Sequence, residues 1–201
     1  LLTFLITYLL HLFLLKNEKP IFILELPSFR KPKIFKTIYF SLKEKALHVL
    51  KRAMIVSFPA GLLIYFLANV TIDGFSILTY LRSFFEPFGL FIGLDGAILL
   101  AFLLGLPANE IVIPILLLLY SGGSVLISYE SLDSLKQIFI LNHWTILTAL
   151  NFLIFSLCHF PCATTLLTIK KETNSCFYTI LSFLIPTLLG ICLCFLMTLF
   201  F

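Results

Sequence analysis

Long apolar runs separated by short polar segments dominate the chain. The runs cover residues 53–68, 97–106, 111–120, 144–160 and 176–201, and none of them contains Asp, Glu, Lys or Arg. A helix rises about 1.5 Å per residue, so about twenty apolar residues cross a bilayer. The pattern predicts membrane helices at 53–68, 144–160 and 176–201. The two runs of ten residues each reach only about half of the hydrocarbon core, roughly 15 Å.

These two half-length runs flank a polar centre, Pro107-Ala108-Asn109-Glu110. A carboxylate at the depth where two half-helices meet is unstable unless it faces protein, water or a cation, so Glu110 is a candidate functional residue. Many transporters build a binding site at the membrane midplane from broken helices of this kind. The alternative interpretation is a single span of about 24 residues that is kinked at Pro107, with Glu110 paired to a neighbouring helix.

Composition supports a membrane protein. Apolar residues make up 60% of the sequence and charged residues 12%, which excludes an ordinary soluble domain. We therefore expect an all-α integral membrane fold with broken or re-entrant helices. The five cysteines are an odd number, and four of them lie inside apolar runs, so no disulfide framework is expected.

Positive charge is concentrated between the first two apolar regions. Residues 16–52 hold ten Lys or Arg against three Glu, a net charge of +7, whereas the remainder holds four against seven, a net charge of −3. This asymmetry predicts a basic cytoplasmic linker, which includes an amphipathic helix on the membrane surface with apolar residues at 34, 38, 42, 46 and 50. Residues 1–15 are expected to be the end of a truncated transmembrane helix. No recognition motif accompanies the basic block, so we expect contact with lipid head groups and not with nucleic acid.

The order of the predicted spans tests whether the broken element 89–123 is re-entrant or crosses the membrane once. If 16–52 is cytoplasmic, the span 53–68 leads outside, and the span 144–160 must return from outside to place Lys170 and Lys171 in the cytoplasm. The element 89–123 must then begin and end on the outer side. A re-entrant hairpin of two half-helices satisfies this requirement, and a single crossing does not.

A second break is predicted at 158–165, where Cys158, His159, Pro161 and Cys162 end the span 144–160. Thiolate, imidazole and carboxylate ligands together suit a borderline divalent transition metal. The alternative roles are packing for the cysteines, a hydrogen bond from His159 to a carbonyl freed by Pro161, and helix hydrogen bonds for the threonines that follow.

Asp95, between two glycines, is expected to cap the first half-helix. The 201 residues contain no hydrolase, metalloprotease or nucleotide-binding motif, so we expect no enzyme activity.

Five segments together resemble the C-terminal membrane region of the FeoB-type ferrous iron transporters. They are ILELPSFRKP (23–32), LKRAMIV (50–56), EPFG (86–89), GLDGAILLAFLLGLPANEIVIPI (93–115) and HFPCATTLLTIKKE (159–172). The resemblance implies that residues 53–201 form the second of two gate domains, a gate-type helical bundle. It implies Fe(II) as the transported ion, no bound organic cofactor, and a multi-pass location in the bacterial cytoplasmic (inner) membrane. The implied partners are a GTP-binding domain and a first gate that have no counterpart here; the resemblance leaves a homo-oligomer open.

Residue by residue, the resemblance places Glu110 and Cys162 along the iron path, with His159 as a hypothetical third ligand. The same motifs contain gate or structural positions, namely Pro107, Asn109, Pro114, Pro161, Thr164 and Thr165. Two alternatives remain open. A gate of a nucleoside-type permease would rely on hydrogen bonds from Asn109, Thr164 and Thr165, whereas a non-transporting membrane assembly subunit would not need Glu110 for uptake.

Overall fold

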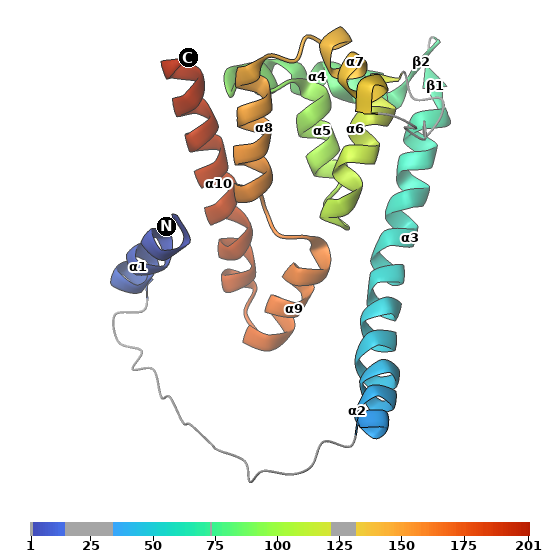
Figure 1. Cartoon of the computed structure of the whole chain (residues 1–201), viewed down its shortest axis with the longest axis vertical. Coiled ribbons are helices and arrows are strands. Elements are labelled where there is room, and N and C mark those ends of the chain that lie inside the picture. The colour runs from blue at the N-terminus through green and yellow to red at the C-terminus, as the bar shows by residue number, and fades with distance from the viewer. Residues whose placement is uncertain (1, 15–33, 73, 122–131) are drawn as a thin grey trace. The chain divides into compact units, whose positions relative to one another are not determined.

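A computed structural model describes residues 2–14, 34–72, 74–121 and 132–201 (Figure 1). The ELPSFRKP motif, residues 16–33 of the predicted linker, and Gly122 and Gly123 lie outside the described residues. The chain divides into two compact units, residues 1–40 and 41–201. The first contains α1 (Leu2–Leu14) and α2 (Ile34–Phe40), and the functional candidates all lie in the second.

The second unit begins with a π-helical turn, Ser41–Ala46, and the long helix α3 (Leu47–Asn69). Pro59 lies inside α3 without ending it. A two-stranded hairpin follows, in which β1 (Thr71–Ile72) pairs antiparallel with β2 (Phe75–Ser76). The hairpin turns the chain from α3 into α4.

Helix α4 (Ile77–Phe91) is a finding that the sequence pattern did not predict. The region 69–87 has mixed polarity and reads as a polar connection, but its apolar residues recur on one side of a helix. Leu78 is buried, whereas Phe84 and Phe88 on the apolar side are exposed. Arg82 and Glu86, on the polar side, are half-buried and line a pocket. The chain then turns through Gly93, whose φ of +69° suits glycine, and bends by 111° into α5.

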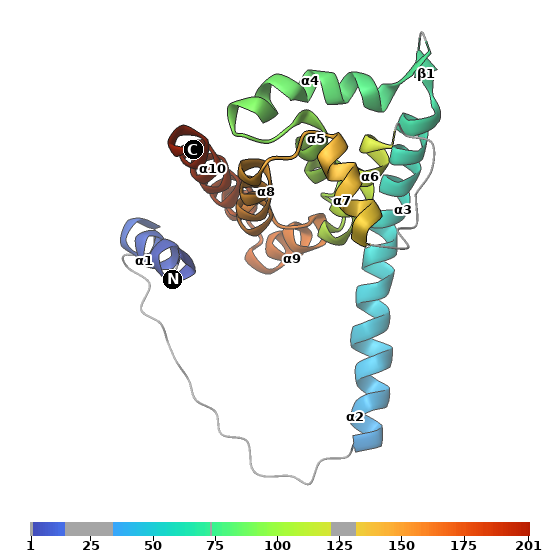
Figure 2. The same ribbon diagram turned by 45° about the horizontal axis from the view of Figure 1, so that its top comes forward.

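Helices α5 (Gly96–Leu104) and α6 (Val112–Tyr120) form the centre of the unit. Figures 1 and 2 show that they run side by side in opposite directions between α3 and α8, so that α5 begins and α6 ends at the same end of the unit. We call this end the α4 end and the opposite one the α9 end. The hairpin of α5 and α6 supplies most of the buried apolar core, including Ala97, Ile98, Leu100, Ala101, Phe102, Ile115, Leu116 and Leu119.

The remaining helices are α7 (Leu132–Leu141), α8 (Ile146–Cys158), α9 (Ala163–Thr173) and α10 (Cys176–Phe200). Helix α8 leads from the α4 end to the second break, α9 continues to the α9 end, and α10 returns beside α8 (Figure 1). Cys158 packs against α10, where Gly190 leaves room for it. A break at 159–162 separates α8 from α9, so Cys158 and Cys162 do not share the face of one continuous helix.

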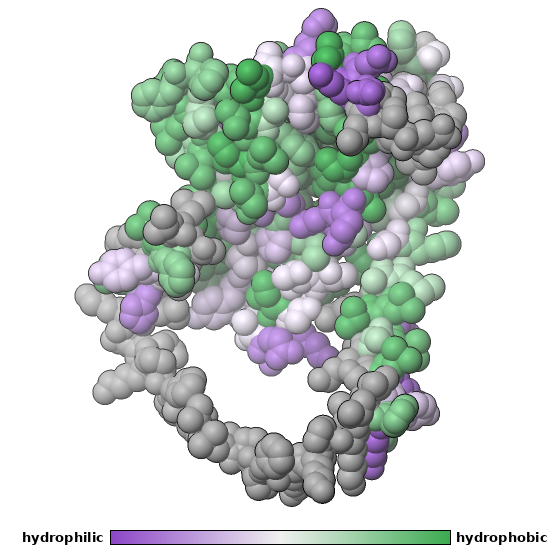
Figure 3. Space-filling model, viewed as in Figure 1, coloured by the Kyte–Doolittle hydropathy of each residue, from purple (hydrophilic) through white to green (hydrophobic). Residues whose placement is uncertain are grey.

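Among the described residues, three helical stretches are long and apolar enough to cross a membrane: 42–69, 146–173 taken through its break, and 176–200. The bent pair of α4 and α5 could add a fourth. Large apolar side chains on these stretches are exposed, for example Phe58, Leu157 and Leu188. Hydrophobic residues cover much of the visible surface where α8 and α10 lie, whereas hydrophilic groups gather beside α7 and α9 (Figure 3). The predicted all-α membrane fold with broken helices is confirmed.

Candidate functional site: two helix breaks that meet

The first break separates the two central half-helices. Helix α5 ends at Leu104, and a 3₁₀ turn, Asn109–Ile111, leads into α6. Pro107 cannot donate a backbone hydrogen bond and so favours the interruption. Gly105 allows a close approach, because a Cβ atom there would overlap the side chain of Val112. Pro114 is compatible with α6 because it lies in the first turn of that helix.

The second break separates α8 from α9. His159 follows the last residue of α8 in an extended conformation, with φ −72° and ψ 173°. Pro161 keeps the preceding residues extended, and α9 begins after Cys162. The Sγ atom of Cys162 lies 3.1 Å from the hydroxyl oxygen of Thr164 and 3.0 Å from that of Thr165. The thiol is therefore held at the start of α9 by the two threonines.

The two breaks contact each other. The backbone N–H of Ala163, the first residue of α9, donates a hydrogen bond of 2.7 Å to the carbonyl oxygen of Leu106. On the other side of the second break, the ring of His159 packs on Phe102 of α5, with ring centroids 4.9 Å apart. Two motifs that are far apart in the sequence thus form one junction of interrupted backbone.

At this junction His159 has one ring nitrogen free to act as a ligand. Its Nδ1 lies 2.8 Å from the carbonyl oxygen of Ser156. Because a carbonyl only accepts hydrogen bonds, Nδ1 carries the proton and Nε2 of the neutral ring carries a lone pair. Nε2 is buried and has no hydrogen-bond partner among the described residues. A histidine that ligates a metal commonly has this arrangement, with the second nitrogen fixed by a carbonyl.

Asn109, in the first break, is a second residue with an unsatisfied polar atom. Its Oδ1 is buried and also has no partner within the described part of the chain. Unpaired buried acceptors are rare, since each leaves a desolvated group uncompensated. Each break therefore contributes one buried acceptor that water or an ion can satisfy.

The structure does not gather the three predicted ligands into one closed cluster. Glu110 is exposed in the 3₁₀ turn of the first break, while His159 and Cys162 belong to the second. Across the described ranges, no group of three or more His, Cys, Asp or Glu side chains is placed to hold a metal ion. The assignment of Glu110, His159 and Cys162 as ligands stays a prediction.

A polar network at the α4 end was missed by sequence reasoning. Asp95 caps α5, as predicted, by accepting a hydrogen bond of 2.6 Å from the N–H of Ile98. Its other oxygen accepts a hydrogen bond from the hydroxyl of Tyr120, which in turn accepts one of 2.7 Å from Nε1 of Trp144. The guanidinium of Arg82 lies over the Tyr120 ring. The only signal in the sequence was Tyr120, whose hydroxyl group ends an otherwise aliphatic half-helix.

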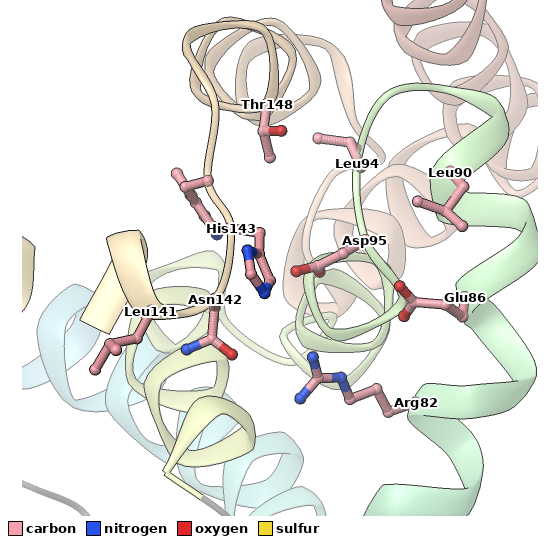
Figure 4. Close-up of a pocket in the computed structure, with 10 residues that line it drawn as sticks. Arg82, Glu86, Leu90, Leu94, Asp95, Leu141, Asn142, His143 and Thr148 are labelled. Atoms are coloured by element: carbon pink, nitrogen blue, oxygen red, sulfur yellow. The ribbon is translucent and has the colours of Figure 1, made fainter. Parts of the chain in front are cut away.

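This network adjoins a pocket of about 490 Å³. Figure 4 shows that Arg82 and Glu86 of α4, Asp95, and the turn of Asn142 and His143 surround a common space. The pocket and the junction of the two breaks lie at opposite ends of α5.

Comparison with known proteins places the chain in a family. The Gate family, described as "Nucleoside recognition", matches residues 50–176. The chain is 33% identical over 193 residues to the protein named Fe(2+) transporter FeoB of Staphylococcus aureus (strain MSSA476), an alignment that covers 91% of this chain and 27% of the relative. It is 26% identical over 200 residues to the Fe(2+) transporter FeoB of Leptospira interrogans (serovar copenhageni), covering 87% of this chain and 28% of that protein.

The Fe(2+) transporter FeoB of Campylobacter jejuni is 29% identical over 177 residues, with 81% of this chain and 28% of the relative covered. The chain thus spans little more than a quarter of the length of these curated relatives. No solved structure matched it.

Proposed function

The chain belongs to the Gate family, and from this premise we propose that it is the membrane-translocation part of a Fe(II) uptake transporter. Relatives that carry the name Fe(2+) transporter FeoB match it over 91% of its length, which supports ferrous iron as the transported ion. In this proposal a GTP-binding domain and a first gate, neither of which this chain supplies, complete the transporter and energise or regulate it in the bacterial inner membrane.

The observation that carries the proposal is the junction of the two breaks. The hydrogen bond from Ala163 to Leu106 joins the interrupted backbone of the α5–α6 hairpin to that of the α8–α9 segment. Interrupted helices expose carbonyls and side-chain ligands at membrane depth only where they line a cavity or contact protein. Nε2 of His159 and Sγ of Cys162 are a nitrogen and a sulfur donor of the kind that borderline divalent metals accept.

In this account the ion passes the junction with Cys162 and His159 as ligands from one break and Glu110 as a ligand from the other. Because the three are not gathered in the described conformation, the account requires the half-helices to move as the ion passes. The exposed position of Glu110 leaves its carboxylate free to approach the ion. Pro107 and Pro161 keep both segments interrupted, so that such movement does not require helical hydrogen bonds to break.

Ferrous uptake tests the proposal. The complete transporter that contains this region would be expressed in cells whose own iron uptake is disabled, and Cys162→Ser and Glu110→Gln would be compared with wild type at matched membrane levels. Each substitution removes a ligand, and we expect the maximal rate of uptake to fall at least about tenfold, the range of a lost metal ligand or its support. Cys176→Ser is the matched control, because Cys176 is exposed at the start of α10 and lies outside both breaks. Uptake at the wild-type rate by both variants would contradict the proposal.

The family description favours a second candidate, a gate for nucleosides. Such a site would use hydrogen bonds from Asn109, Thr164 and Thr165, and both threonine hydroxyls are already within 3.1 Å of the Cys162 sulfur. Uptake of radiolabelled nucleoside that is insensitive to Cys162→Ser would favour this candidate. Competition between ferrous iron and nucleoside uptake in the same cells distinguishes the two.

A further inference from the structure

The pocket at the α4 end has no role in the junction of the two breaks. It lies where α5 begins, and its walls come from separate segments of the second unit: α4, the turn that precedes α5, and the turn between α7 and α8 (Figure 4). Its volume of about 490 Å³ falls within the range of small-ligand sites. The predicted order of spans places this end outside, the side from which an imported ion would arrive.

The charge of the pocket favours a cation. Glu86 and Asp95 contribute two negative charges and Arg82 contributes one positive charge, so the described lining has a net charge of −1 with His143 neutral. The guanidinium of Arg82 is held over the ring of Tyr120, at 5.6 Å from its centroid. The negative charges are thus partly, but not fully, offset.

The acceptors in the pocket are fixed and have unused capacity. An ionised carboxylate offers about four lone-pair positions. Glu86 accepts one hydrogen bond, of 3.0 Å, from the N–H of Gly96, and Asp95 accepts from Ile98 and Tyr120. The amide nitrogen of Asn142 donates to the carbonyl of Ile138, and its oxygen has no hydrogen bond to another described residue. Each acceptor is therefore oriented by at least one contact and has lone pairs for a further hydrogen bond.

The size of the pocket suits a cation that keeps its water. At about 30 Å³ per water, the volume corresponds to roughly sixteen water molecules, more than twice the six that surround a small divalent ion. The described residues do not provide three His, Cys, Asp or Glu side chains close enough to replace that water. Recognition here would occur through hydrogen bonds from coordinated water to the carboxylates.

We propose that this pocket captures the hydrated divalent cation before it enters the junction of the two breaks. The inference rests on the proposed function for the identity of the ion. Helix α5 has nine residues and leads from the pocket to the first break, a rise of roughly 13 Å. The opposing charge of Arg82 keeps binding weak enough for release, which conduction requires.

The test is the concentration dependence of anaerobic Fe(II) uptake by the complete transporter. A divalent ion several ångströms from one carboxylate in a hydrated site gains about 1 kcal/mol, about a fivefold change in affinity. Glu86→Gln should therefore raise the half-saturating Fe(II) concentration about fivefold, and Arg82→Gln should lower it by a similar factor. The maximal rate should stay within about twofold in both. If Glu86 and Arg82 had a purely structural role, the two substitutions would not shift the half-saturating Fe(II) concentration in opposite directions.

Matched controls make the same changes in charge at the opposite end of the unit. Glu172→Gln and Lys171→Gln alter exposed residues of α9. They should leave the half-saturating concentration unchanged, because the distance and the solvent screen their charges. Size-exclusion profiles of the purified variants establish that they are folded.

The result can separate this inference from the proposed function. If Glu86→Gln and Arg82→Gln shift half-saturation in the same direction or not at all, while Cys162→Ser still abolishes uptake, the capture pocket is wrong and the iron path stands. If the transporter carries no Fe(II), binding of Fe(II) to the purified protein is measured directly. Binding that Glu86→Gln does not weaken then overturns the pocket as well.

Discussion

Asn151 is the side chain that ties three segments of the second unit together. It is fully buried in α8, and its amide nitrogen donates hydrogen bonds of 3.0 Å to the carbonyl of Ile92 and to the hydroxyl of Thr198. Ile92 lies in the turn between α4 and α5, and Thr198 lies in α10. The amide oxygen of Asn151 is buried and has no partner among the described residues, so the amide nitrogen makes the side-chain contacts that fix the turn before α5.

Asn151→Leu should lower the free energy of unfolding by about 1–3 kcal/mol, because it leaves the carbonyl of Ile92 without its partner. Thermal unfolding of the purified protein in detergent measures the change. Asn69→Leu is the control, since the amide of Asn69 bonds only within its own helix, to the carbonyl of Tyr65, and is exposed. Equal losses in the two variants would mean that the connection between segments contributes nothing.

Gly93→Ala tests the packing of the same turn against Asn151 and Thr198. Gly93 has a φ of +69°, and a Cβ atom there would overlap the polar ends of Thr198 and Asn151. Gly74 has a similarly positive φ of +84° but open space around it. Both alanine substitutions strain the backbone, so the difference in stability between the two variants measures the clash at Gly93. We expect Gly93→Ala to be the less stable by about 1–3 kcal/mol in the same unfolding assay; equal stability would contradict the packing of the turn.

Between elements, the hydrogen bond from Ala163 to Leu106 is the contact that joins the two breaks. Ala163→Pro removes the donor with little effect on α9, because proline is accepted at the first position of a helix. The preceding residue, Cys162, already has the extended conformation that proline requires, with φ −60° and ψ 157°. We expect Fe(II) uptake to fall at least about tenfold, while Ala163→Ser, which keeps the N–H, transports normally. Circular dichroism verifies that helix content is unchanged. Normal uptake by the proline variant would make the contact between the breaks dispensable.

Sequence reasoning located the elements whose signals are local. Pro107 and Pro161 interrupt apolar runs, and the cap at Asp95 follows from its position before a half-helix, so both breaks and the start of α5 were predictable. Helix α4 was missed because polar residues, among them Arg82 and Glu86, interrupt its apolar residues in the sequence and so resemble a loop. The contacts of Tyr120 with Asp95 and Trp144 depend on the tertiary fold, which brings residues 24 and 25 positions apart together. The meeting of Leu106 and Ala163 could be expected only from the resemblance to a gate, not from the residues themselves.

At the scale of the whole molecule, the α5–α6 hairpin determines how many times the chain crosses the membrane. A hairpin that begins and ends at the α4 end places α4 and the residue after α6 on the same side, in agreement with the order of spans predicted from the sequence (Figure 1). A single kinked span would place them on opposite sides.

Labelling with a membrane-impermeant maleimide distinguishes the two topologies. Single cysteines would be introduced as Ser83→Cys on α4, Ser121→Cys after α6 and Lys171→Cys on α9, in the complete transporter with its other cysteines replaced. In intact cells from which the outer membrane has been removed, the first two should react and the third should react only after lysis. Reaction of the Ser83 variant but not the Ser121 variant before lysis would contradict the re-entrant hairpin.

Protection of Cys162 by Fe(II) is the most direct measurement of the central claim, that the two breaks line the path of the ion. The transporter would keep Cys162 as its single cysteine and be treated anaerobically with a small water-soluble thiosulfonate, with and without Fe(II). A variant that keeps only Cys158, which is buried against α10, serves as the control. We predict that the reagent modifies Cys162, that Fe(II) slows this reaction several-fold, and that the control reacts slowly in both conditions. Modification of Cys162 at the same rate with and without Fe(II) would contradict the claim.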